Sequence, residues 1–181
     1  STRAPPSSAP KCRVAVLDTG VQLQPPLLAP GSISFVGGDP LVDYAKQGTH
    51  GTAVAQVILT LAPGSKILSL QTSTGGSSVS ASAVYQGLLH AAANPSIRVI
   101  NHSNAALATV PGDAMLAAAV AGKVIVMQAG NDAASSPRGD ALHAPGLGGK
   151  GLIVGGWGPG GSMLGFSNQA GSYAHHYVVA L

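Results

Sequence analysis

Short runs rich in Val, Ile and Leu alternate with longer Ala- and Leu-rich runs along most of this 181-residue chain. The short runs favour strands, and the longer ones have the apolar spacing of helices. Turn-forming pairs such as Pro63-Gly64 separate them. The pattern predicts strands over 12–17, 32–36, 66–71, 97–101, 123–127, 152–154 and 177–180, and helices over 51–61, 79–93 and 114–121.

Strands that alternate with helices of this length predict βαβ units, and therefore a doubly wound α/β domain with a mainly parallel sheet. The run 123–127 is almost wholly apolar, so we expect this strand to be buried on both faces. Functional residues of such sheets gather at the carboxyl ends of the strands. Asp18, His102-Ser103-Asn104 and Ala129-Gly130-Asn131 each follow a predicted strand, so we expect them to converge.

The composition suits one large core, because 45% of the residues are hydrophobic and only 8% are charged. An ordinary domain has roughly 25% charged residues, so the deficit favours a secreted, cell-surface or assembled protein. The nine Lys and Arg residues are scattered along the sequence, which argues against a nucleic-acid partner. Residues 1–11 are rich in Ser, Ala and Pro and are predicted to form a linker before a single domain over 12–181. Cys12 is the single cysteine, so no intrachain disulfide is possible.

Two segments carry the strongest chemical signal. Asp18-Thr19-Gly20 places an acid after a buried strand, and Gly48-Thr49-His50-Gly51-Thr52 places a histidine in a Gly-rich turn before an apolar helix. An Asp and a His in this order are two of the three members of a nucleophilic triad. Each also has a plainer explanation, since Asp18 could cap a turn and His50 could make a structural hydrogen bond at a helix start. A serine in a suitable setting is not found among the 181 residues.

These two segments, together with Ala129-Gly130-Asn131-Asp132, resemble the Asp, His and oxyanion-Asn blocks of the subtilisin-like serine proteases, or subtilases. The resemblance runs from about residue 12 to the end of the chain. The stretch 152–180 is similar to the subtilase passenger domains of bacterial autotransporters, which would place the protein at a bacterial outer membrane.

The resemblance implies a subtilisin-like fold, incomplete at its carboxyl end, and a serine endopeptidase acting through an acyl-enzyme. Asp18 would orient the imidazole, His50 would act as general base and then acid, and Asn131 would donate a hydrogen bond to the oxyanion. Asn131 could instead be a turn residue. The resemblance also implies contacts with the substrate. Ser103, Asn104 and Ala105 would pair with the substrate backbone. Ala129 and Gly130 would line the pocket for the side chain of the residue before the scissile bond. The family has glycines just after that serine, so Asn104 and Ala105 predict a narrower cleft.

The resemblance also implies that the nucleophilic serine lies beyond Leu181, on a helix packed against the sheet. Ser162, in Gly160-Gly161-Ser162-Met163, and Ser167 are rejected, because neither begins a helix and both precede the last predicted strand. We therefore expect a polypeptide substrate and a carboxyl-terminal partner segment that carries the serine. Without that helix, the strand faces at 14–17 and 124–127 are expected to meet water.

Two other hypotheses stay open. The protein could be a serine-less relative that only binds peptides or scaffolds another domain, or it could be an unrelated α/β domain. Neither a cofactor nor a metal is expected, because no acidic loop is typical of a calcium site. The remaining histidines also lack paired metal-ligand spacing. They are His90, His102, His143, His175 and His176. His102 lies near the expected cleft, where it could contact substrate, but we expect it to be structural.

Overall fold

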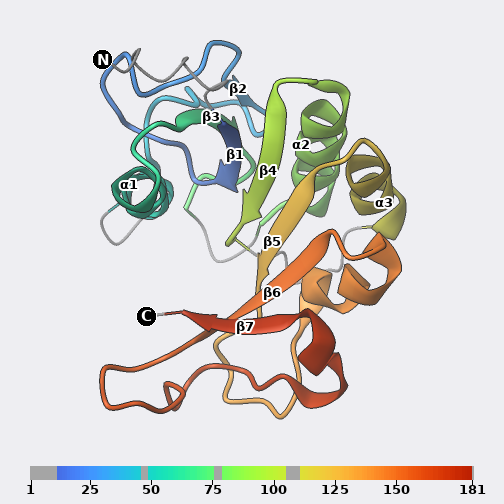
Figure 1. Ribbon diagram of the computed structural model, residues 1–181. Helices are drawn as coiled ribbons and strands as arrows, with labels where there is room; N and C mark the ends of the chain where they lie inside the picture. The colour runs from blue at the N-terminus through green and yellow to red at the C-terminus, as the bar shows by residue number, and fades with distance from the viewer. Residues whose placement is uncertain (1–11, 46–48, 76–78, 105–110, 181) are drawn as a thin grey trace, which may run out of the picture.

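One parallel sheet organises the molecule (Figure 1). The structure, a computed structural model, describes residues 12–45, 49–75, 79–104 and 111–180. Within them the strand order is β2-β3-β1-β4-β5-β6-β7, and every neighbouring pair is parallel. The strands are β1 (Arg13–Asp18), β2 (Ile33–Ser34), β3 (Lys66–Gln71), β4 (Ile97–His102), β5 (Val124–Gln128), β6 (Gly151–Gly156) and β7 (Tyr177–Ala180). The predicted doubly wound α/β fold is confirmed, and each predicted strand lies within two residues of its expected bounds.

The helices are α1 (Gly51–Leu61), α2 (Ala81–Ala93) and α3 (Gly112–Val120), close to the three predicted. Helix α2 begins two residues later than predicted because the Ser80 hydroxyl accepts a hydrogen bond from the Ala83 amide and so caps it. Two 3₁₀ helices, η1 (Gly139–Leu147) and η2 (Gly171–His176), were not predicted. In η1, Pro145 and two glycines interrupt any apolar spacing.

The helices cover the two faces of the sheet unequally (Figure 1). Helices α2, α3 and η1 lie on one face and enclose the larger hydrophobic core. On the other face α1 packs over β1 and β3, and a smaller cluster of Val14, Val16, Val21, Ala55 and Ile67 fills the space between them. Strands β1 and β3 are consequently buried on both faces.

The expectation that the strand at 123–127 is buried on both faces is wrong. Along β5 the residues alternate, with Ile125 and Met127 buried and Val124 and Val126 only half-buried. The expectation that the strand face at 14–17 meets water is also wrong, because α1 covers it. The reason for both differences is the position of α1, which lies over β1 and β3, so that no helix in the described part of the chain covers the same face of β5.

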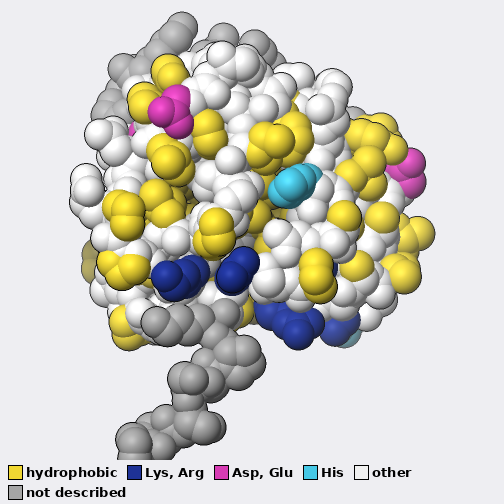
Figure 2. Space-filling view, turned by 90° about the horizontal axis from the view of Figure 1, so that it is seen from above, with side chains coloured by type: hydrophobic (Ala, Val, Ile, Leu, Met, Phe, Trp, Pro, Cys, Tyr) yellow, Lys and Arg dark blue, Asp and Glu magenta, His cyan; other side chains and the backbone are white. Residues whose placement is uncertain are grey.

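The basic side chains gather in space, although they are scattered in the sequence. Of the six Lys and Arg residues that the structure describes, five lie at or just before the amino ends of strands: Arg13, Lys66, Arg98, Lys123 and Lys150. Figure 2 looks onto this edge and shows the basic side chains along one side. Lys123 is buried, and its ammonium donates to the carbonyls of Asn94 and Ile97. Burial, with the charge of Arg98 nearby, lowers the pKa of Lys123.

Among the described residues, no helix is long and apolar enough to span a membrane.

Candidate active site

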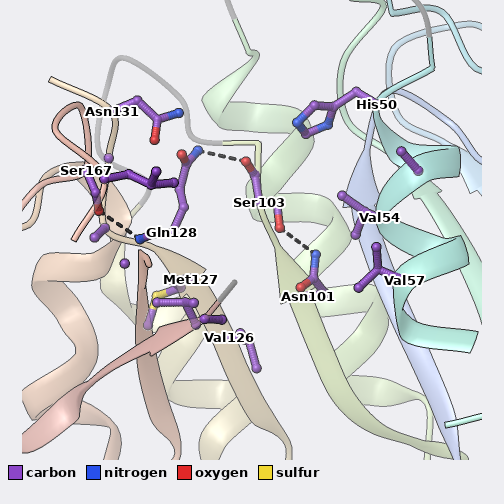
Figure 3. Close-up of a pocket in the computed structure, with 18 of the residues that line it drawn as sticks. His50, Val54, Val57, Asn101, Ser103, Val126, Met127, Gln128, Asn131 and Ser167 are labelled. Carbon is purple, nitrogen blue, oxygen red and sulfur yellow. Dashed lines mark hydrogen bonds between the residues drawn. The ribbon is translucent and has the colours of Figure 1, made fainter. Parts of the chain in front are cut away.

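Asp18 and His50 meet at the carboxyl end of β1. The Asp18 side chain is fully buried, whereas the His50 side chain is 51% exposed. His50 Nδ1 lies 2.7 Å from Asp18 Oδ1, which confirms the predicted contact. Because a carboxylate accepts, Nδ1 carries the hydrogen, and Nε2 is left as the basic nitrogen of the neutral ring. The ring points toward the neighbouring pocket (Figure 3).

The Asp18 carboxylate is itself held by the backbone. Its Oδ1 accepts a second hydrogen bond, of 2.7 Å, from the amide of Thr19. The other oxygen, Oδ2, is buried and has no hydrogen-bond partner in the structure. The Thr19 hydroxyl also lies 3.2 Å from Oδ1, so all three described contacts converge on this oxygen, which faces the imidazole.

A second carboxylate, Asp43, anchors the first turn of α1. Its Oδ1 accepts the Thr19 hydroxyl at 2.6 Å, and its Oδ2 accepts the Thr52 amide at 2.7 Å. Anions are favoured at helix amino ends, where backbone N–H groups lack partners. His50 is the N-cap of α1, so Asp43 stabilises the turn from which the imidazole projects. The roles of Asp43 and Thr19 were not predicted. Asp43 lies in a loop that reaches the first turn of α1 only once the chain has folded.

Gly51 permits the close approach between α1 and the end of β1. A Cβ at this position would lie 2.2 Å from the Gly20 carbonyl oxygen and 3.0 Å from Asp18 Cβ. The first contact is with backbone and could not be relieved by a side-chain rotation. The glycine after the histidine is thus required for the distance between His50 and Asp18.

The electrostatics favour a protonatable His50. The hydrogen bond with Asp18 raises the pKa of His50 above its ordinary value of 6.5; partial burial opposes this, and the charges of Asp18 and Asp43 add to it. Burial favours the neutral form of Asp43, but hydrogen bonds from Thr19, Thr52 and Ala45 outweigh it, and the pKa of Asp43 lies below its ordinary 3.8. Two carboxyl side chains, those of Asp18 and Asp43, therefore act on one imidazole.

A cleft of about 730 Å³ lies beside His50, on the face of β5 that none of the described helices covers. Its α1 wall is apolar and includes Val54 and Val57, and its floor includes Val126 and Met127 (Figure 3). Polar groups line the upper part of the cleft. Ala180, at the end of β7, also lines it.

The predicted site residues mostly gather around this cleft. His50 and Asn131 lie on opposite sides of it, with Ser103 between them (Figure 3). Ala129 and Gly130 line it as well. Asn104 follows Ser103 and is half-buried, but it is not among the lining residues. Ala105 falls outside the described residues.

Ser103 is fixed at the end of β4 by two hydrogen bonds. Its hydroxyl accepts from Asn101 Nδ2 at 2.8 Å, and its carbonyl accepts from Gln128 Nε2 at 2.8 Å (Figure 3). The second bond joins the ends of β4 and β5 across the cleft floor. Gln128 was not predicted as a site residue.

The two rejected serines occupy different places. Ser167 lines the cleft, but it is buried, and its hydroxyl accepts from the Gly156 amide at 2.9 Å and donates to the Asn168 carbonyl. Ser162 is exposed in a turn and is not a lining residue. Neither begins a helix, as expected.

His102, expected to be structural, is buried beside the site. Its Nε2 lies 2.8 Å from Asp140 Oδ2 on η1, and both side chains are buried. The pair ties the end of β4 to η1 on the helix-covered side of the sheet. Within the part of the chain that the structure describes, His, Cys, Asp and Glu form no group of three or more suited to a metal ion.

Comparisons with known structures agree with this architecture. The chain is similar to the prenylagaramide maturation protease PagA, with a TM-score of 0.70 and 23% identity over 95% of this chain and 63% of that one. It is also similar to a serine-to-alanine mutant of the protease domain of PatA, with a TM-score of 0.74 and 21% identity over 97% of this chain and 69% of that one. The chain thus spans less than two thirds of the PagA chain. No curated protein matches the sequence.

The family comparison covers almost the whole chain. The model of the subtilase family, Peptidase S8, matches residues 10–180. This range includes the Asp18–His50 pair, the cleft and all seven strands. The chain belongs to the subtilase family.

Proposed function

We propose that this chain forms part of a serine endopeptidase that cleaves polypeptides through an acyl-enzyme. In this reaction Asp18 holds the tautomer of His50 and stabilises the imidazolium. His50 Nε2 takes the proton of the nucleophilic serine and later delivers it to the leaving amine. Asn131, across the cleft, donates a hydrogen bond to the oxyanion of the tetrahedral intermediate.

The observation that carries the proposal is the Asp18–His50 contact of 2.7 Å at the edge of an open cleft. A buried aspartate that bonds to Nδ1 leaves Nε2 available as a base. A histidine that merely caps a helix does not need such a partner. The amide of Asn131 lies on the far side of the same cleft (Figure 3). A carbonyl bound between them would have a base on one side and a hydrogen-bond donor on the other.

The nucleophile is proposed to come from a segment outside residues 1–181. Of the serines at the cleft, Ser103 accepts from Asn101, and Ser167 is buried with its hydroxyl bonded. The apolar face of β5, between α1 and the Ser167 loop, has the character of a surface that a helix covers. Because Ala180 lines the cleft, a segment that follows β7 would enter it directly.

The substrate is proposed to be a polypeptide whose backbone runs beside Ser103 and Asn104, with a side chain in the space lined by Ala129 and Gly130. Small lining residues leave room for a large apolar side chain there. Secretion or a cell-surface location remains a prediction that rests on the low content of charged residues.

The proposal is tested with the complete protein that contains residues 1–181. Hydrolysis of a denatured protein substrate is followed for the wild type, for His50→Ala and for His175→Ala, a control that removes an exposed histidine of η2. We expect His50→Ala to abolish cleavage and His175→Ala to retain it. Peptide binding without cleavage by the wild type would contradict the proposal and favour the serine-less peptide-binding alternative.

A further inference from the structure

Asn168 lies directly against the turn that carries Asn131. Its side chain is fully buried and makes three hydrogen bonds to backbone. Asn168 Oδ1 accepts from the amides of Asp132 at 2.9 Å and Ala134 at 3.0 Å. Its Nδ2 donates to the carbonyl of Ala129 at 3.1 Å. The side-chain amide therefore bonds to backbone on both sides of Asn131.

The backbone of Asn168 adds to the same contact. Its amide donates to the Gly130 carbonyl at 3.0 Å. Gly130 has φ of +109°, and a Cβ there would lie 2.3 Å from Asn168 Nδ2. The glycine thus serves two needs, since it adopts a left-handed backbone and leaves room for the Asn168 amide.

Asn168 is in turn held from behind. The Tyr177 hydroxyl, at the start of β7, donates to the Asn168 carbonyl. The preceding Ser167 hydroxyl bonds to the Gly156 amide of β6. The residue is therefore fixed to two strands on one side and to the turn 129–134 on the other.

Asn131 has no comparable restraint of its own. Its side chain is exposed and lies at the cleft, and among the described residues none makes a hydrogen bond to it. The position from which it projects into the cleft is therefore set by the backbone of the turn. Asn168 makes hydrogen bonds to this backbone on both sides of Asn131. Before it, Asn168 bonds to the carbonyls of Ala129 and Gly130, and after it, to the amide of Asp132.

We propose that Asn168 is a positioning residue that sets the direction of the Asn131 amide through the backbone on either side. The inference rests on the proposed function insofar as Asn131 serves the oxyanion. An oxyanion donor acts at a defined distance, and a displacement of about 1 Å can cost about 10²-fold in rate. Asn168 touches no substrate itself and acts only through Asn131.

The first test is a double-mutant cycle on kcat in the complete enzyme. We expect Asn168→Ala to lower kcat by up to about 10²-fold with little change in KM, because the oxyanion exists only in the transition state. In the Asn131→Ala background, Asn168→Ala should lower kcat by no more than a few-fold, because the group it positions is gone. Losses that multiply independently in the double mutant would overturn the proposal.

The second test measures how firmly the turn 129–134 is held and does not depend on enzyme activity. Amide hydrogen exchange of residues 129–134 is expected to accelerate in Asn168→Ala. The matched control is Asn94→Ala, since Asn94 Oδ1 also accepts bonds, from the Ser96 amide and hydroxyl, but lies at the end of α2 away from the cleft. Asn94→Ala should lower the melting temperature and leave both kcat and exchange at 129–134 unchanged.

A milder variant covers the case in which Asn168→Ala does not fold. Tyr177→Phe removes only the hydroxyl that bonds to the Asn168 carbonyl. It should lower kcat by less than Asn168→Ala does, and should not lower kcat further in the Asn131→Ala background. Unchanged exchange at 129–134 in both variants would overturn the positioning role. If Asn131→Ala alone leaves kcat unchanged, the oxyanion assignment fails, while the exchange experiment still decides whether Asn168 holds the turn.

Discussion

At the scale of single residues, a few polar side chains hold the site in place. Asp18 bonds to the His50 imidazole, Asp43 bonds to the first turn of α1, and Asn168 bonds to the turn beside Asn131. The contact between Asp18 and His50 was predictable, because each residue sits in a short local motif and the fold brings the end of the strand to the start of the helix. The contacts of Asp43 and Asn168 were not, because each bonds to backbone distant in sequence, and neither the type of side chain nor its neighbours in the chain signals that contact.

The pKa of His50 should depend on Asp18. The Asp18→Asn substitution removes the main cause of the raised pKa, so we expect the titration midpoint of the His50 ring, followed by NMR, to fall. Asp113→Asn removes a charge on α3 and should leave the midpoint unchanged. If Asp18→Asn leaves it in place, the carboxylate is not what stabilises the imidazolium.

The sign of this shift also fixes a pH dependence. Because folding raises the pKa of His50, its protonation stabilises the folded state fully below the ordinary value of 6.5 and no longer does so once the pH has risen through the folded value. A general base must be neutral, so activity should rise with a midpoint above 6.5. A profile of kcat/KM against pH checks this, and an acid limb centred below that value would contradict it.

Asn131→Ala should lower kcat by about 10²–10³ and raise KM far less. The magnitude is the one observed for the oxyanion asparagine of subtilisin, a protease of the same family. Steady-state kinetics of the complete enzyme separate the two parameters. Equal effects on kcat and KM would indicate that Asn131 binds the ground state of the substrate.

At the scale of elements, helix α1 has two tasks. Its first turn presents His50, and its apolar side covers β1 and β3. The sequence predicted its bounds because eleven residues carry an uninterrupted helical pattern between a Gly-rich turn and Pro63-Gly64. The extent of sheet that α1 covers was not predictable, since the pattern of one helix does not reveal which strands it crosses. The 3₁₀ helix η1 was missed because Pro145 and its glycines break any period.

Gly51→Ala tests the close contact between α1 and β1. The added methyl would meet the Gly20 carbonyl, so we expect a loss of about 1–3 kcal/mol in the free energy of unfolding and a lower kcat. Gly64→Ala, just after the same helix, has nothing within 4 Å of the added methyl and should change the free energy by less than about 0.5 kcal/mol. Chemical denaturation compares the two, and equal effects would show that the contact does not restrain α1.

At the scale of the whole molecule, β1 and β3 are the strands that the described residues bury on both faces. An almost wholly apolar sequence predicted the same for β5, yet every second residue of β5 is only half-buried. The sequence could reveal an apolar strand, but not which part of the protein covers it. This face coincides with the cleft beside His50, where we propose that the segment carrying the nucleophile binds.

Residues 1–181 alone are therefore expected to expose an apolar surface. A hydrophobic dye such as ANS should bind them, and adding the segment that carries the serine should displace the dye and raise the melting temperature. The half-buried Val126 on the cleft floor makes a convenient reporter, because its methyl resonances should shift when the segment binds. Dye-free, cooperative unfolding that the segment does not alter would show that this face needs no cover.

We propose that residues 1–181 supply the base and the oxyanion donor, while the nucleophile comes from a segment outside them. The most direct measurement is to label the complete protein with a fluorophosphonate and to identify the modified serine by peptide mass spectrometry. We expect one labelled serine outside residues 1–181, with labelling lost in His50→Ala. Labelling of Ser103, Ser162 or Ser167, or labelling that persists without His50, would contradict it.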